Sequence, residues 1–253
     1  MEKNRSLLYA AIWGLAMVIT AFVIGKGIRN RNANQDAINV VGLGSKDFIS
    51  DEILWKGSFS TRSMDAKEAY NTILADKEKV RQFFIAKGFK EGEFTFGGAT
   101  IEKTFRTVST EVRDGETRSE QVFDGYTATQ SISFFCRKND ALMRRIEQVS
   151  DQTSELINSG IEFNGQDIQY TYSDLPSLKH NLIEKATQDA KERAQKIVKT
   201  GNGDIGKLKD ASMGVFQITG KGSVEEDSCG GNFDTRSKEK TARITVRLSY
   251  VLE

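Results

Sequence analysis

Apolar residues form one long uncharged run near the start of the chain and several shorter periodic segments after it. The uncharged run extends from Ser6 to Gly25. A helix rising about 1.5 Å per residue over this length would match the roughly 30 Å hydrocarbon layer of a bilayer. Because the run is longer than the apolar core of a signal peptide and basic residues follow it directly, we favour a retained anchor over a cleaved signal. We therefore expect residues 1–31 to form a membrane anchor with basic flanks and residues 32–253 a soluble domain.

Two segments of the soluble part have the three- and four-residue apolar spacing of amphipathic helices. The first occupies residues 65–88, and Asp65 and Glu68 form a capping-box pattern at its start. The second follows Asn139, a plausible N-cap, and ends at Gly160. The apolar positions are Ala66, Ala69, Tyr70, Ile73, Leu74, Val80 and Phe84 in the first segment, and Leu142, Ile146, Val149, Leu156 and Ile157 in the second.

A third helix is predicted after Asp174, which can cap it near Pro176, and it closes at Thr200-Gly201. Its apolar stripe is narrow and rich in alanine, and consists of Leu178, Leu182, Ala186, Ala190, Ala194 and Ile197. Small residues at these positions would permit close packing on a sheet or on a neighbouring helix.

Extended segments separate these helices. They are predicted at residues 38–43, 52–61, 93–107, 122–137, 161–172, 208–216 and 242–252. Residues 126–137 largely alternate apolar and polar side chains, with an interruption at Gln130, as in a strand with one buried face. The polar residues 109–121 centre on Asp114-Gly115, a favoured turn dipeptide, and predict a long, partly mobile hairpin connection. The order of elements predicts an α+β fold with antiparallel sheets and amphipathic helices packed on them, preceded by the N-terminal transmembrane helix.

Charge and cysteine content narrow the possible functions. The chain has 36 basic and 35 acidic side chains and no basic stripe with interleaved aromatic residues, so we expect no nucleic-acid partner. Its two cysteines, Cys136 and Cys229, lack zinc-ligand spacing. A single bridge between them stays open, although we favour a buried free Cys136 and a Cys229 in a loop.

No constellation of residues predicts catalysis, a cofactor or a metal site. His180 is the only histidine and lies off the stripe of the third helix, as a solvated residue would. Gly42-Leu43-Gly44 lacks the third glycine of a dinucleotide-binding turn, and we interpret it as a strand-end turn or bulge. The segment 220–223, Gly-Lys-Gly-Ser, lacks the upstream glycine of a phosphate-binding loop. We therefore expect no enzyme activity.

Four segments resemble, in order and spacing, the SIMPL domain, also known as domain of unknown function 541. They are INVVGLGS (38–45), KGFKEGEFTFGGATIEK (87–103), GYTATQSISFFCRKNDALMRRIEQV (125–149) and KATQDAKERAQKIVKTGNGDIGKLKDAS (185–212). The resemblance covers nearly all of the soluble part. It implies an exported protein of the bacterial envelope that tends to oligomerise into ring- or channel-like assemblies, and it implies no established enzyme chemistry.

Together these observations predict a single-pass protein of the inner (cytoplasmic) membrane, held through residues 6–25. Basic residues flank both ends of the anchor, so they do not decide its orientation, and the resemblance favours a periplasmic soluble domain. We expect a self-associating protein, a homo-oligomer, with a structural or stress-related role. The alternative is a monomeric anchored module that binds a small molecule, of unknown identity, or another envelope protein.

Overall fold

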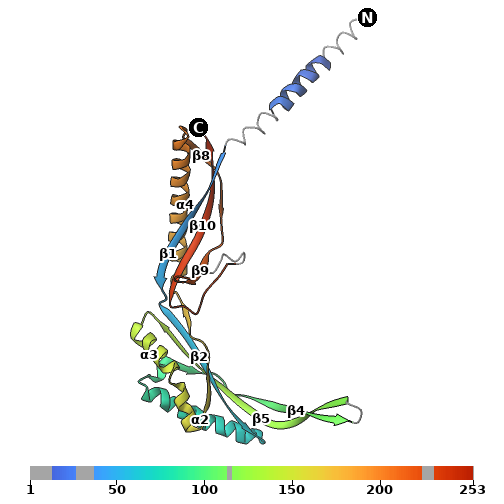
Figure 1. Ribbon diagram of the computed structural model, residues 1–253, viewed down its shortest axis with the longest axis vertical. Coiled ribbons are helices and arrows are strands. Elements are labelled where there is room, and N and C mark those ends of the chain that lie inside the picture. Colours follow the sequence, from blue (N-terminus) through green and yellow to red (C-terminus); the bar gives the residue numbers. More distant parts are fainter. Residues whose placement is uncertain (1–12, 27–36, 113–115, 224–230, 253) are drawn as a thin grey trace. The chain divides into compact units, whose positions relative to one another are not determined.

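The computed structural model of the protein describes residues 13–26, 37–112, 116–223 and 231–252. Its sheets are antiparallel and accompanied by helices, so the predicted α+β class is confirmed (Figure 1). The chain divides into two compact units. Unit 1 takes its residues from 1–45, 179–216 and 243–253, and unit 2 from 46–178 and 217–242.

Residues 13–26 form a helix whose large apolar side chains are exposed. Within the described part of the chain, no helix combines the length and the apolar character needed to cross a membrane. The predicted anchor at residues 6–25 begins before the first described residue. The transmembrane span is therefore unconfirmed and stays a prediction.

The elements that follow include the predicted strands and helices in the predicted order, with β9 and two 3-10 helices in addition. They are β1 (Ala37–Ile49), β2 (Glu52–Ser63), α2 (Ala66–Ala86), the 3-10 helix η1 (Glu91–Glu93), β3 (Phe94–Phe96), β4 (Thr100–Val112), β5 (Glu116–Arg137), α3 (Asp140–Ser150), the 3-10 helix η2 (Thr153–Ser159), β6 (Glu162–Gly165), β7 (Gln169–Thr171), α4 (Leu175–Thr200), β8 (Ile205–Met213), β9 (Gln217–Gly220) and β10 (Glu239–Leu252). One sheet has the order β1-β10-β8, with β9 also paired to β10. The other has the order β3-β5-β2-β6, with β4 on β5 and β7 on β2.

The core of unit 2 lies between its sheet and the helices α2 and α3. Strands β2 and β5 pair without a register break from Glu52↔Arg137 to Ser63↔Tyr126, and alternate side chains face the core. The residues buried there from these two strands are Ile53, Trp55, Phe59, Ala128, Ile132, Phe134 and Cys136. Complete burial of one such large apolar side chain contributes about 1.5–3 kcal/mol. Gln130 shares this inward face and is buried, with its amide nitrogen donating to the Gly97 carbonyl at 2.9 Å.

Helix α2 begins where its cap predicts. The Asp65 carboxylate accepts a hydrogen bond from the Glu68 amide at 2.9 Å, which is the first half of the predicted capping box. The second half is not formed, because the Glu68 carboxylate instead accepts from the Ser63 hydroxyl at 2.5 Å. The buried stripe is also narrower than predicted, since Tyr70 and Leu74 are exposed.

The predicted second helix is interrupted. Asn139 does cap α3, accepting from the Leu142 amide at 3.1 Å, but the α-helix ends at Ser150 and continues as the separate 3-10 turn η2. Gly160 closes η2 in the left-handed conformation, with φ of 75°. Because η2 is a separate 3-10 turn, its side chains do not continue the apolar face of α3. Leu156 is buried, while Ile157, predicted to share the apolar face, is exposed.

In unit 1, α4 packs closely on strands of the first sheet. The side chains of Leu182, Ala186, Ala190 and Ala194 are all fully buried. A Cβ at Gly42 would lie 2.1 Å from the Ala186 carbonyl oxygen, and one at Gly44 would lie 2.2 Å from the carbonyl oxygen of Leu182. The interpretation of Gly42-Leu43-Gly44 as a strand-end turn or bulge was wrong. Both glycines lie within β1 and permit its close approach to the helix.

Two further predictions need correction. Strands β4 and β5 remain paired through Val112 and Glu116, so the predicted hairpin at 109–121 is present, but most of the segment is strand and not connection. Its centre, 113–115, lies outside the described residues. At the end of α4, Ile197 is exposed and Val198 takes its place in the buried stripe, because the four-residue spacing continues from Ala194.

Candidate functional site

Strands β4 and β5 form a two-stranded arm whose outer part extends beyond α2 (Figure 1). The pairing is regular except at one bulge, where the register passes from Lys103↔Tyr126 to Phe105↔Phe123. Thr104 therefore stands opposite two residues of β5, one of which is Gly125 with φ of 103°. This positive φ is accessible to glycine at little cost.

The bulge determines which side chains share a face. Paired residues of antiparallel strands point to the same side, so Ile101 lies beside Ala128, and Phe105 lies beside Phe123. Without the extra residue, strict alternation from Tyr126 would place Asp124 on this face in place of Phe123. We call Ile101, Phe105, Phe123 and Tyr126 the apolar row.

The apolar row continues the core-facing side of the sheet but is not covered as the core is. Ala128, paired with Ile101, is fully buried, whereas Phe105 is 52% and Phe123 38% exposed. The ring centroids are 6.0 Å apart for Phe105 and Phe123 and 5.3 Å apart for Phe123 and Tyr126. Scattered exposed apolar residues are ordinary, but contiguous ones often mark docking surfaces.

The opposite face of the arm is charged. Asp124 accepts from Arg62 at 2.9 Å and lies 3.9 Å from the Arg106 guanidinium. Exposed ion pairs of this kind contribute little to stability, typically below about 1 kcal/mol. They lie on the face opposite the apolar row, whereas the face of the row has one charged residue in its midst, Lys103, between Ile101 and Phe105.

A second candidate is an open polar cleft of about 440 Å³ in unit 2. Its walls come from the residues after α3, the β6–β7 connection and Arg236. Its lining consists of Trp55, Ser150, Asp151, Thr153, Gly165, Gln166, Asp167, Ile168, Tyr170 and Arg236. The indole nitrogen of the buried Trp55 donates to the Gln166 carbonyl at 3.0 Å, which fixes the connection against the core.

A family model described as SIMPL, protein of unknown function (DUF541), matches residues 38–250. The chain belongs to the SIMPL family. The match includes both units, the arm and the cleft. The search of curated proteins returned no match.

Next to the cleft of this SIMPL domain, Glu147 accepts hydrogen bonds from two side chains. Its Oε1 accepts from the Tyr170 hydroxyl at 3.0 Å and from Lys238 Nζ at 2.8 Å. Burial, together with the hydrogen bond and charge of Glu147, raises the pKa of Tyr170 far above its usual range. The Tyr170 hydroxyl is therefore held as a hydrogen-bond donor to Glu147.

Lys240 is buried more deeply than any other described lysine. Its ammonium donates to the Asp234 carbonyl. Burial lowers the pKa of Lys240, and the negative charge of Asp234 opposes that shift. Aromatic and apolar residues line most of its surroundings, and Lys240 is 2% exposed. A reactive amine would need access to substrate, which this enclosure denies.

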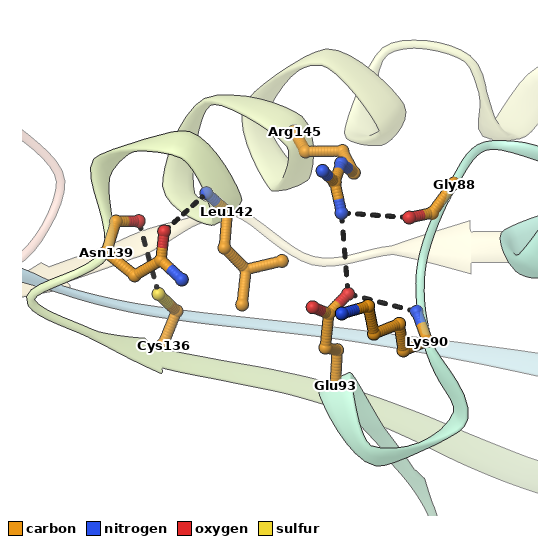
Figure 2. A network of polar contacts seen from close by, with 7 residues as sticks. All are labelled: Gly88, Lys90, Glu93, Cys136, Asn139, Leu142 and Arg145. Carbon is orange, nitrogen blue, oxygen red and sulfur yellow. Dashed lines mark hydrogen bonds and ion pairs between the residues drawn. The ribbon is translucent and has the colours of Figure 1, made fainter.

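Cys136 belongs to a polar network that joins α3 to neighbouring loops (Figure 2). Its thiol is buried and donates to the Asn139 carbonyl at 3.5 Å, and burial raises its pKa. A protonated, enclosed thiol is a poor nucleophile. Arg145 donates to the Gly88 carbonyl at 2.8 Å and lies 3.5 Å from Glu93, so the network has a structural role. Cys136 is free, as favoured from the sequence, and Cys229 lies outside the described residues.

Two sequence candidates remain, His180 and the segment 220–223. His180 is exposed on α4. Gly220-Lys221-Gly222-Ser223 forms a tight turn closed by a 3.0 Å hydrogen bond from the Ser223 amide to the Gly220 carbonyl. Across the described ranges, no group of three or more His, Cys, Asp or Glu side chains could hold a metal ion.

Sequence reasoning missed both the apolar row and the cleft. Phe105 and Phe123 lay near the ends of the predicted strands, and nothing in their spacing showed that the helices would not cover them. The cleft residues come from connections without a motif. One signal was present, because a buried tryptophan such as Trp55 needs a hydrogen-bond acceptor nearby.

Proposed function

We propose that this SIMPL-family protein is a membrane-anchored protein of the cell envelope that self-associates, with a structural or stress-related role and without catalysis. The observation that carries the proposal is the apolar row on the arm. Its aromatic side chains are exposed in a single chain, although the same face of β5 is covered by helices closer to the core. Association would bury these rings and gain free energy that the single chain does not gain.

The N-terminal segment supports the anchor part of the proposal. The described helix at residues 13–26 exposes Trp13, Leu15, Met17, Val18, Ile19, Phe22, Val23 and Ile24, and the uncharged run begins before it, at Ser6. Exposed apolar residues all round a helix are favourable in lipid and costly in water. We place the helix in the inner membrane and the remaining domain on the periplasmic side.

The mass of the full chain tests self-association. The protein would be extracted in detergent and measured by light scattering over a dilution series, with the detergent contribution subtracted. We expect a discrete oligomer that dissociates on dilution. A monomer at every concentration would contradict the proposal.

Labelling tests the location independently of the mass. A Ser109→Cys variant in a Cys229→Ser background carries its added thiol at an exposed position on the arm, while Cys136 is buried. A membrane-impermeant maleimide added outside spheroplasts should modify this variant. Labelling only after the membrane is broken would overturn the periplasmic placement.

The polar cleft favours a second candidate, a monomeric anchored binding module. Its volume suits a small polar molecule, and Asp151 and Asp167 supply acceptors at its edge. In that case a ligand from a panel of small polar compounds would raise the melting temperature of the full chain. The double change Asp151→Ala with Asp167→Ala would remove that increase, and the chain would remain monomeric throughout.

A further inference from the structure

Strand β4 presents a long free edge. It has 13 residues, and among the described residues its only partner is β5. Strand β3 pairs with the later residues of β5, and so leaves the outer side of β4 open. Alternate amide and carbonyl groups along such an edge are unpaired and are a template for another strand.

We propose that the edge of β4 pairs antiparallel with β4 of a second copy of this chain, about a two-fold axis that passes through Thr104. The inference rests on the proposed self-association and names its interface. A two-fold axis perpendicular to the sheet keeps the same face of both copies on the same side of the joined sheet. Residues directly opposite one another in an antiparallel pair point to the same side. The axis must therefore place one residue of β4 directly opposite its own copy, and an axis through a residue is named here by that residue.

Among axes through residues 103–106, charge complementarity selects Thr104. With the axis there, Glu102 of each copy faces Arg106 of the other, which gives two opposite-charge pairs by symmetry. Lys103 faces Phe105, an arrangement that favours a cation–π contact. Glu102, Lys103 and Arg106 are all exposed in the single chain and so are available to a partner.

Axes through Lys103, Phe105 or Arg106 do not give these opposite-charge pairs. An axis at Lys103 or at Arg106 places two like charges directly opposite one another, which destabilises a strand pair. An axis at Phe105 places Glu102 opposite Val108 and forms no opposite-charge pair. The register through Thr104 also sets the two apolar rows on the same side of one continuous sheet, where Lys103 of each copy covers part of Phe105 of the other.

Disulfide trapping tests the register in the full chain. In a Cys229→Ser background, Thr104→Cys places a thiol on the two-fold axis, and Ser109→Cys is the matched control on the same strand. The register separates the two copies of position 109 by about ten residues, or about 33 Å, far beyond disulfide reach. Under mild oxidation in detergent, we expect a covalent dimer for Thr104→Cys and none for Ser109→Cys. Equal trapping at both positions would overturn the register.

Charge exchange tests the ion pairs. Glu102→Arg alone and Arg106→Glu alone each create two like-charge contacts in a homodimer, and each should raise the dissociation constant about tenfold. An equimolar mixture of the two variants restores both opposite-charge pairs, so it should associate about as tightly as the unchanged chain. A mixture as weak as either variant would contradict the pairing.

The possible outcomes separate this inference from the proposed function. If the unchanged chain is oligomeric but Thr104→Cys gives no covalent dimer, self-association stands and the β4 interface is wrong. If the unchanged chain is monomeric at every concentration, both are wrong.

Discussion

Strand β5 passes through two different environments on one face. Between Ala128 and Cys136 its inward side chains are buried under α2 and α3, whereas Phe123, further along the same face of the sheet, is exposed. Both parts carry aromatic residues on this face, Phe134 in the first and Phe123 and Tyr126 in the second. What differs is whether helices of the same chain pack over this face of the strand. The apolar residues of the arm thus contribute little to folding and remain available for association.

The largest expected effect lies on the covered part. Phe134 is fully buried against Trp55 and Phe84, at ring-centroid distances of 5.2 Å and 4.8 Å. Phe134→Ala should lower the free energy of unfolding by about 3–5 kcal/mol, because it leaves a cavity in a packed core. Urea unfolding followed by circular dichroism would measure this loss. Phe135, the next residue, points to the opposite face and is 56% exposed, so Phe135→Ala is the control and should cost much less.

The junction between the two parts comes next. Gly125 has φ of 103°, and an added Cβ would lie 2.8 Å from the Ser63 carbonyl oxygen. Gly125→Ala should cost about 1–3 kcal/mol through backbone strain and this close contact. Gly160 also has positive φ but has no atom near an added Cβ, so Gly160→Ala isolates the backbone effect. If urea unfolding shows a smaller loss of unfolding free energy for Gly125→Ala than for Gly160→Ala, the bulge is not tightly held.

A smaller effect is expected at the one polar position on the covered face. Gln130→Ala removes the hydrogen bond to the Gly97 carbonyl and should lower the unfolding free energy by about 1 kcal/mol. Thermal unfolding would measure it, with Ser131→Ala on the exposed face as the control. A stabilised Gln130→Ala variant would mean that the unpaired amide oxygen of Gln130 outweighs this hydrogen bond.

The smallest effect on stability is expected on the uncovered part. Phe123→Ala removes a ring that touches only Phe105 and Tyr126 among the described aromatic residues, and should cost less than about 1 kcal/mol in the dissociated chain. Urea unfolding at a protein concentration below that of association would check it. A loss as large as that of Phe134→Ala would remove the contrast between the two parts of β5.

The sequence predicted the features that depend on residues close together in the chain. Asp65, Asn139 and Asp174 each lie at a helix start because a carboxylate or amide oxygen can accept from the first free amides. The α+β class followed from the order of periodic segments. The alternation in β5 also correctly identified its inward apolar residues.

The features missed from the sequence depend on distant contacts. The close packing of Gly42 on Ala186 involves residues far apart in the chain, and a short glycine motif resembles a turn until its partner is known. The bulge at Gly125 shifts the phase of alternation, so periodicity alone could not align Phe123 with Phe105. The exposure of that pair depends on where α2 ends over the sheet, which no local pattern specifies.

The central claim is that the uncovered apolar row drives association, and one comparison of masses tests it most directly. The full chain in detergent would be measured by light scattering beside Phe105→Ser/Phe123→Ser and beside Val41→Ser/Leu43→Ser, a control pair of exposed apolar residues in unit 1. Loss of interface anchors costs about 2 kcal/mol or more each, so the first variant should be monomeric where the unchanged chain and the control are oligomeric. An oligomer that survives Phe105→Ser/Phe123→Ser unchanged would contradict the account.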